Sequence, residues 1–142
     1  MTTIAADLTS MSSDSMVSWG ERSYFTKKTA RCKGAIYGFA GDFEAVTKLL
    51  NWVNDGMPAR KRPDINWEDV ETLVLRKNGL FYLRPDFKEY PFNRACFAIG
   101  TGSMAAMGAM MAGAEPYDAV RIACDIDPNS SGEIHTEFLS LR

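Results

Sequence analysis

The sequence predicts an α+β fold in which two sheets pack against each other and helical layers lie outside them. Three observations lead to this class. The chain has 142 residues, enough for one hydrophobic core, and the candidate helices are grouped in two insertions between runs of strands. The order is four strands, a helix, a very short helix, three strands, two helices and a strand, whereas a parallel sheet would need strands and helices in alternation. We expect one domain, spanning residues 2–142.

The first forty residues contain four short candidate strands, rich in β-branched and aromatic residues. They cover residues 2–8, 16–19, 23–26 and 35–40, and residues 10–13 form a Ser-rich turn after the first of them. Gly20 and the pair Lys33-Gly34 fall in breaks between the strands, where turn chemistry favours glycine.

The middle of the chain begins with a helix, from Asp42 as its cap to Gly56 at its end, with apolar residues at helical spacing. A basic, proline-bounded loop follows at residues 57–63, which we interpret as solvated because it carries three charges and little aromatic interleaving. Residues 66–69 predict a capped turn of helix. The dipeptide Asn78-Gly79 predicts a hairpin between strands at 71–77 and 80–84.

The last third of the chain is predicted to hold a strand at 95–99, a helix at 103–113, a helix from 115 to 124 and a strand at 132–139. The helix at 103–113 consists of Ala, Gly and Met. Its small residues would let it lie close to a sheet, and its methionines fit core packing better than a cofactor site.

Composition excludes several classes of function. A net charge of −2 and a pI near 5.4 do not favour binding to nucleic acid or to an anionic membrane. The single histidine, His135, excludes clustered His metal sites. Cys32, Cys96 and Cys124 indicate reduced thiols, and the most apolar stretch, 103–114, is too short to span a bilayer. With no secretory signal visible, we expect a cytoplasmic protein.

Thr2 is the candidate nucleophile. Removal of Met1 would place a hydroxyl and a free α-amine on one residue, and an α-amine has an unperturbed pKa of about 7.7–8.0. Such an amine can accept the hydroxyl proton without any histidine. A start of this kind is common in unrelated chains, so the assignment depends on the rest of the sequence.

Five further segments, in order along the chain, carry a resemblance that spans nearly all of it. The sequence is similar to the proteasome β-subunit family, most closely to bacterial HslV-type peptidases, at Asp14-Ser15-Met16-Val17-Ser18-Trp19-Gly20, Lys27-Lys28-Thr29-Ala30-Arg31, Gly38-Phe39-Ala40-Gly41-Asp42, Ile99-Gly100-Thr101-Gly102-Ser103 and Asp127-Pro128-Asn129-Ser130-Ser131-Gly132. The resemblance implies an N-terminal nucleophile hydrolase. Its fold would be a compact version of the four-layer αββα sandwich of two mainly antiparallel sheets.

The resemblance also implies roles for individual residues. It makes Thr2 the nucleophile, Asp14 the partner of the active-site lysine, Lys28 that lysine, Gly41 the oxyanion-hole glycine, Thr101 the hydroxyl near the amine, and Asp127 and Ser130 a supporting polar pair. Lys27 competes with Lys28, because neighbours on a strand point to opposite faces and only one can point inward. Two positions depart from the family: Thr101 replaces a serine, and Ser131 replaces a glycine.

Substrate and ion sites follow from the same resemblance. It implies that the specificity pocket is lined by Val17, Thr26, Ala30, Phe39 and Phe43, and that the backbone of Ser18 pairs with extended substrate. None of the five pocket residues is charged, so we expect cleavage after apolar residues. No cofactor is required, and the one ion implied is a structural monovalent cation such as Na⁺, held by the backbone carbonyls of Cys124, Asp127 and Ser130.

The expected function is a threonine-type endopeptidase that cleaves unfolded polypeptide inside a homo-oligomeric ring or stacked rings, served by an AAA+ ATPase unfoldase. An inactive ring-forming scaffold or adaptor, and an amidohydrolase of small amides, remain as alternatives. Residues 66–70 leave little of a helix that in the family lies near subunit contacts. No nucleic acid or membrane partner is expected.

Overall fold

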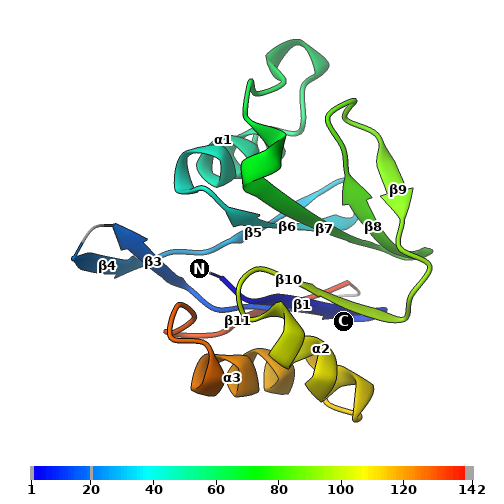
Figure 1. Ribbon diagram of the computed structural model, residues 1–142. Helices are drawn as coiled ribbons and strands as arrows, with labels where there is room; N and C mark the ends of the chain where they lie inside the picture. The colour runs from blue at the N-terminus through cyan, green and yellow to red at the C-terminus, as the bar shows by residue number, and fades with distance from the viewer. Residues whose placement is uncertain (1, 20, 140–142) are drawn as a thin grey trace.

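Two antiparallel sheets lie face to face between helical layers in the computed structural model, which describes residues 2–19 and 21–139 (Figure 1). Met1 and the predicted turn residue Gly20 lie outside the described residues. The predicted four-layer α+β sandwich is confirmed. Helix α1 (Phe43–Asn54) covers one sheet, and α2 (Ser103–Met111) with α3 (Pro116–Ile126) covers the other.

The four-stranded sheet has the order β10-β1-β2-β11 and holds the beginning of the chain at its centre. Its strands are β1 (Ile4–Asp7), β2 (Ser10–Ser13), β10 (Cys96–Ile99) and β11 (His135–Phe138). The predicted Ser-rich turn at 10–13 is wrong. These residues are the buried strand β2, which pairs with β1 on one side and β11 on the other, and Ser12 Oγ lies 2.8 Å from Thr136 Oγ1.

The five-stranded sheet follows the order β5-β6-β7-β8-β9. Its strands are β5 (Thr29–Cys32), β6 (Ala35–Gly41), β7 (Val70–Arg76), β8 (Gly79–Leu83) and β9 (Glu89–Pro91). The hairpin predicted around Asn78-Gly79 is confirmed as β7–β8. The sequence pattern missed β5 and β9.

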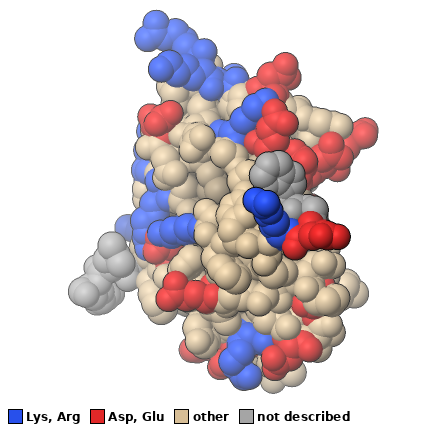
Figure 2. All heavy atoms as spheres, turned by 90° about the vertical axis from the view of Figure 1, so that its left-hand side faces the viewer, with Lys and Arg blue, Asp and Glu red and all other residues tan. Residues whose placement is uncertain are grey.

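A separate hairpin, β3 (Met16–Trp19) with β4 (Arg22–Phe25), projects beside the two sheets. Short 3₁₀ turns occupy Ala59–Lys61 and Trp67–Asp69, so the helical layer over the five-stranded sheet is α1 with little else. Arg60, Lys61 and Arg62 are exposed on the loop after α1, where Figure 2 shows basic side chains gathered at the top of the molecule. Among the described residues, no helix has the length and apolar character that a bilayer crossing requires.

Strand alternation distributes the core over three layers. Ile4 and Ala6 of β1 pack between the sheets, whereas Ala5 faces α2 and α3. A Cβ at Gly38 would lie 2.9 Å from Met11 Sδ and 3.0 Å from Ile4 Cγ2, so glycine lets the two sheets approach closely there. The last strand begins at His135 instead of 132, because Gly132 turns the chain with a φ of +89°.

Candidate active site

Thr2 lies just before β1 and is nearly buried, with 5% of its surface exposed. Its Oγ1 accepts a hydrogen bond from Lys28 Nζ at 3.0 Å. Its backbone nitrogen donates to Thr101 Oγ1 at 3.2 Å. The hydroxyl and the nitrogen of Thr2 therefore each face a polar side chain from a distant part of the sequence.

Lys28 forms a buried ion pair with Asp14, at 2.9 Å between Nζ and Oδ1. The Asp14 carboxylate is fully buried and also accepts backbone N–H groups, from Thr3 to Oδ1 at 3.0 Å and from Ser131 to Oδ2 at 3.1 Å. Burial lowers the pKa of Lys28 below its ordinary value, and the attraction of Asp14 offsets this only in part. This lysine is thus easier to deprotonate than one at the surface.

Lys27 points elsewhere. Its Nζ lies 3.2 Å from Glu137 Oε1 in β11, and its side chain is half exposed. Of the two lysines that competed for this role, the one that donates to Thr2 is Lys28.

A second polar chain connects the backbone of Thr2 with the loop after α3. Thr101 Oγ1 donates to Asp127 Oδ2 at 2.6 Å, and Ser130 Oγ donates to the same oxygen at 2.7 Å. Ser130 Oγ is in turn 2.7 Å from Thr3 Oγ1. Burial alone would raise the pKa of Asp127, but the hydrogen bonds from Thr101, Ser130 and the Asn129 backbone outweigh it and lower the pKa. Asp127 is accordingly a carboxylate at neutral pH.

Two glycines let Thr101, and the hydrogen bonds that it makes, approach Thr2 and Thr3 at the start of the chain. A Cβ at Gly100, whose φ is +94°, would lie 2.1 Å from Thr2 O, and a Cβ at Gly102 would lie 1.9 Å from Thr3 Oγ1. Any side chain would therefore push Thr101 away from Thr2. Both glycines belong to the motif Ile99-Gly100-Thr101-Gly102-Ser103, but the motif alone does not indicate this role.

Gly41 ends β6 and faces the same space as Thr2. Its φ is +128°, and a Cβ there would lie 2.1 Å from Asp69 O. The next residue, Asp42, donates its N–H to that oxygen at 2.8 Å and caps α1 through its carboxylate. A side chain at position 41 would break this turn.

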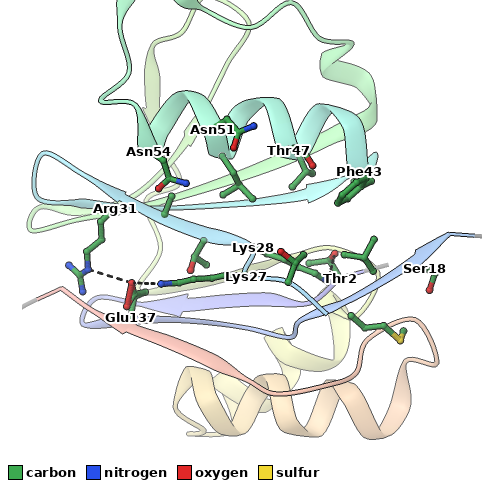
Figure 3. Close-up of a pocket in the computed structure, with 18 residues that line it drawn as sticks. Thr2, Ser18, Lys27, Lys28, Arg31, Phe43, Thr47, Asn51, Asn54 and Glu137 are labelled. Carbon is green, nitrogen blue, oxygen red and sulfur yellow. Dashed lines mark hydrogen bonds and ion pairs between the residues drawn. The ribbon is translucent and has the colours of Figure 1, made fainter. Parts of the chain in front are cut away.

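Beside Thr2 lies a cavity of about 600 Å³ (Figure 3). It is lined by Thr2, Met16, Val17, Ser18, Thr26, Lys27, Lys28, Thr29, Ala30, Arg31, Gly41, Phe43, Val46, Thr47, Leu50, Asn51, Asn54 and Glu137. Five of the residues that the sequence predicted for substrate binding are among them: Val17, Ser18, Thr26, Ala30 and Phe43.

Phe39, which the resemblance placed in the specificity pocket, lies elsewhere in the structure. It does not line the cavity but is completely buried in the core under α1, with its ring stacked 6.4 Å from that of Tyr37. The reason is alternation along β6, which turns Tyr37 and Phe39 together toward the packed interior between the sheet and α1.

The cavity also contains polar residues that the sequence analysis missed. One stripe of α1, at positions 43, 46, 47, 50, 51 and 54, forms a wall and includes Thr47, Asn51 and Asn54. Its helical spacing could have been read from the sequence. Arg31 and Glu137 meet only because the edges of β5 and β11 lie close together, which no local pattern reveals.

The predicted cation ligands lie at the end of α3. The carbonyl of Asp127 accepts the N–H of Ser130 at 3.2 Å, and the helical partner of the Cys124 carbonyl would be Pro128, which has no N–H. No group of His, Cys, Asp and Glu side chains suited to a metal occurs among the described residues. His135 lies in β11, with Nε2 3.1 Å from Glu133 Oε1.

Comparison with known proteins connects this site to solved structures. No protein-family model matches the sequence, and no curated protein matches it. Thiobacillus denitrificans BPH superposes with a TM-score of 0.76 at 18% identity, over 97% of this chain and 98% of that one. The same protein in complex with epoxomicin gives 0.69 at 17%, over 99% of both chains. Eukaryotic HslV from Trypanosoma brucei gives 0.67 at 21%, over 96% and 98%.

At these identities the likeness establishes the fold, over nearly the whole length of both chains. The fold that the resemblance implied is thus confirmed, and the chain shares it with an HslV structure.

Proposed function

We propose that this chain, which has the fold of an HslV structure, is a threonine-type endopeptidase whose nucleophile is Thr2. The observation that carries the proposal is the hydrogen bond from Lys28 to Thr2 Oγ1, backed by the buried carboxylate of Asp14. A hydroxyl that faces a buried ammonium is suited to become a nucleophile, because the positive charge favours its ionised form.

The reaction begins with removal of Met1, which turns the nitrogen of Thr2 into a free amine beside Thr101 Oγ1. The Lys28 charge lowers the pKa of that amine and increases its neutral fraction. The amine then takes the proton of Thr2 Oγ1 as this oxygen attacks the substrate carbonyl carbon. Asp127 holds Thr101 by a hydrogen bond and thereby orients the amine.

The negative charge that develops on the carbonyl oxygen is stabilised by the backbone N–H of Gly41. The protonated amine returns its proton to the leaving nitrogen as the peptide bond breaks, which leaves an ester on Thr2. Water, activated by the same amine, attacks the ester and releases the second product. No histidine takes part.

Extended polypeptide would bind along the β3 edge at Ser18, through backbone hydrogen bonds.

We propose that the chain works as a homo-oligomeric ring in the cytoplasm and receives unfolded substrate from an AAA+ ATPase. T. denitrificans BPH, which shares the fold, is known in complex with epoxomicin, and we propose that this chain binds the same inhibitor at Thr2. A monovalent cation such as Na⁺, held by the carbonyls of Cys124, Asp127 and Ser130, would stiffen the loop that carries Asp127, and the missing N–H at Pro128 fits this role.

The proposal is tested by intact mass and peptide hydrolysis on purified protein. We expect a mass without Met1, cleavage of unfolded polypeptide, no cleavage by Thr2→Ala and partial cleavage by Thr2→Ser, which keeps the hydroxyl. Turnover by Thr2→Ala would disprove the mechanism. Rings that retain Met1 and do not cleave would favour the inactive scaffold, and hydrolysis of small amides alone would favour an amidohydrolase.

A further inference from the structure

The cavity beside Thr2 carries an uneven distribution of charge. Among the described residues that line it, Lys27, Lys28 and Arg31 are cationic and Glu137 is the one acid. The charge of Lys28 is balanced by Asp14. Glu137 alone therefore faces two cations, at 3.2 Å from Lys27 Nζ and 3.6 Å from Arg31 Nε, and one positive charge is left over.

These charged groups lie at one end of the cavity. Figure 3 shows Arg31 and Glu137 at the end opposite Ser18 and Phe43, with Thr2 and Lys28 between them. The Arg31 guanidinium also donates to the carbonyl of Phe138, so it is held in place before any ligand arrives. A rigid donor loses less entropy on binding than a free one.

The wall that α1 forms in the cavity also carries neutral hydrogen-bond donors. Thr47, Asn51 and Asn54 of α1 line the cavity, and so does Thr29, whose buried hydroxyl has no hydrogen-bond partner among the described residues. The C-terminal end of a helix carries about half a negative charge. Here the N–H groups of Asp55, Gly56 and Met57 cap its last carbonyls, so the side-chain cations dominate.

We propose that this cavity selects an acidic side chain, Glu or Asp, on the residue whose carbonyl Thr2 attacks. The inference rests on the proposed function. The apolar side chains of Val46 and Leu50 would contact the methylene groups of that side chain, and its carboxylate would reach Lys27 and Arg31. The uncharged positions in the sequence had predicted a preference for apolar residues instead, and the two predictions differ in the test below.

The test uses peptides that are identical except for Glu, Gln, Leu or Lys at the cleaved residue. We expect kcat/KM for Glu to exceed that for Gln by on the order of threefold to fivefold, as one partly exposed charge would give. Arg31→Met and Lys27→Met should reduce this ratio, whereas Glu137→Gln should increase it. Lys48→Met, on α1 but outside the cavity, is the matched control and should not change it.

The opposite changes expected in the Glu/Gln ratio distinguish an effect of charge from an effect of structure. Arg31→Met and Glu137→Gln break the same ion pair, so a merely structural role would move the Glu/Gln ratio in the same direction in both variants. That result, or a wild-type preference for Leu over Glu, would overturn the inference and leave the proposed peptidase intact.

A binding measurement makes the test independent of catalysis. Fluorescence anisotropy with the Thr2→Ala variant should give a lower Kd for the Glu peptide than for the Gln and Leu peptides. Equal or weaker binding of the Glu peptide overturns the inference even if no variant cleaves. Tighter binding without wild-type cleavage supports the selection of an acidic side chain by the cavity and contradicts the peptidase.

Discussion

The Thr2 site and the cavity next to it share strands but are held in different ways. Around Thr2, the side chains of Asp14, Lys28 and Ser130 are almost fully buried, and each has hydrogen-bond partners within the fold. In the cavity, Lys27 is half exposed and Arg31 about one-third exposed, and both share one carboxylate. The groups proposed for chemistry are thus built into the core, and the groups proposed for selectivity are attached to its rim.

This difference has an energetic consequence. A buried ion pair that loses one partner leaves an uncompensated charge in the core, which destabilises a protein by roughly 3–5 kcal/mol. A surface pair contributes about 0–1 kcal/mol. Changes at the rim can therefore alter substrate preference with little loss of stability, whereas changes around Thr2 affect folding and catalysis together.

Two phenylalanines that the sequence assigned to one pocket provide the largest contrast. Phe39→Ala should destabilise the protein by about 3–5 kcal/mol, since it removes a fully buried ring from the core under α1. Phe43→Ala, at a residue 46% exposed in the cavity wall, should change stability by less than about 1 kcal/mol and raise KM instead. Urea unfolding and peptide kinetics measure the two effects.

The division between core and rim requires that the Phe39 variants change stability and the Phe43 variant changes substrate binding. If Phe39→Ala unfolds too readily for kinetics, Phe39→Leu keeps much of the volume and should leave the cleavage preference unchanged. A shifted preference in Phe39→Leu, or a loss of several kcal/mol in Phe43→Ala, would contradict the division between core and rim.

The buried ion pair gives the next largest effect. Lys28→Met should lower the free energy of unfolding by about 3 kcal/mol, because Asp14 keeps its backbone N–H partners but loses its counter-charge. The double variant Asp14→Asn with Lys28→Met removes both charges and should recover much of that loss while staying inactive. Equal stability of Lys28→Met and wild type, measured by denaturant unfolding, would show that water reaches the pair.

Sequence reasoning succeeded where the information was local. The Asn78-Gly79 hairpin and the cap at Asp42 depend on residues a few positions apart, and both occur as predicted. The strand at Ser10–Ser13 was missed because serine is common in turns, and its burial comes from β1 and β11 on either side.

The residues of the site also fall into those that local sequence information could place and those that only the fold brings together. The resemblance assigned Lys28 to Thr2 over its neighbour Lys27, and the structure places Lys28 there, but alternation by itself did not say which of the two faces Thr2. The Arg31–Glu137 pair joins the edges of two sheets across more than a hundred residues, so only the packed fold brings it together. Phe39 was misplaced because the motif marks its strand but not the direction of its side chain.

The smallest predicted effect is a pH dependence of stability, and it arises from Asp127 in the buried network around Thr2. The folded-state pKa of Asp127 lies below its ordinary value, so its contribution to stability is complete above about pH 4, the unfolded pKa, and is lost as pH falls through the folded value. Asp127→Asn should destabilise the protein by about 1 kcal/mol at pH 7, since Thr101 and Ser130 lose a charged acceptor. In urea titrations, the difference from wild type should shrink as the pH falls below about 4. A constant difference for Asp127→Asn across this range would mean that the carboxylate is not held by its hydrogen bonds, and that Thr101 is positioned by its flanking glycines alone.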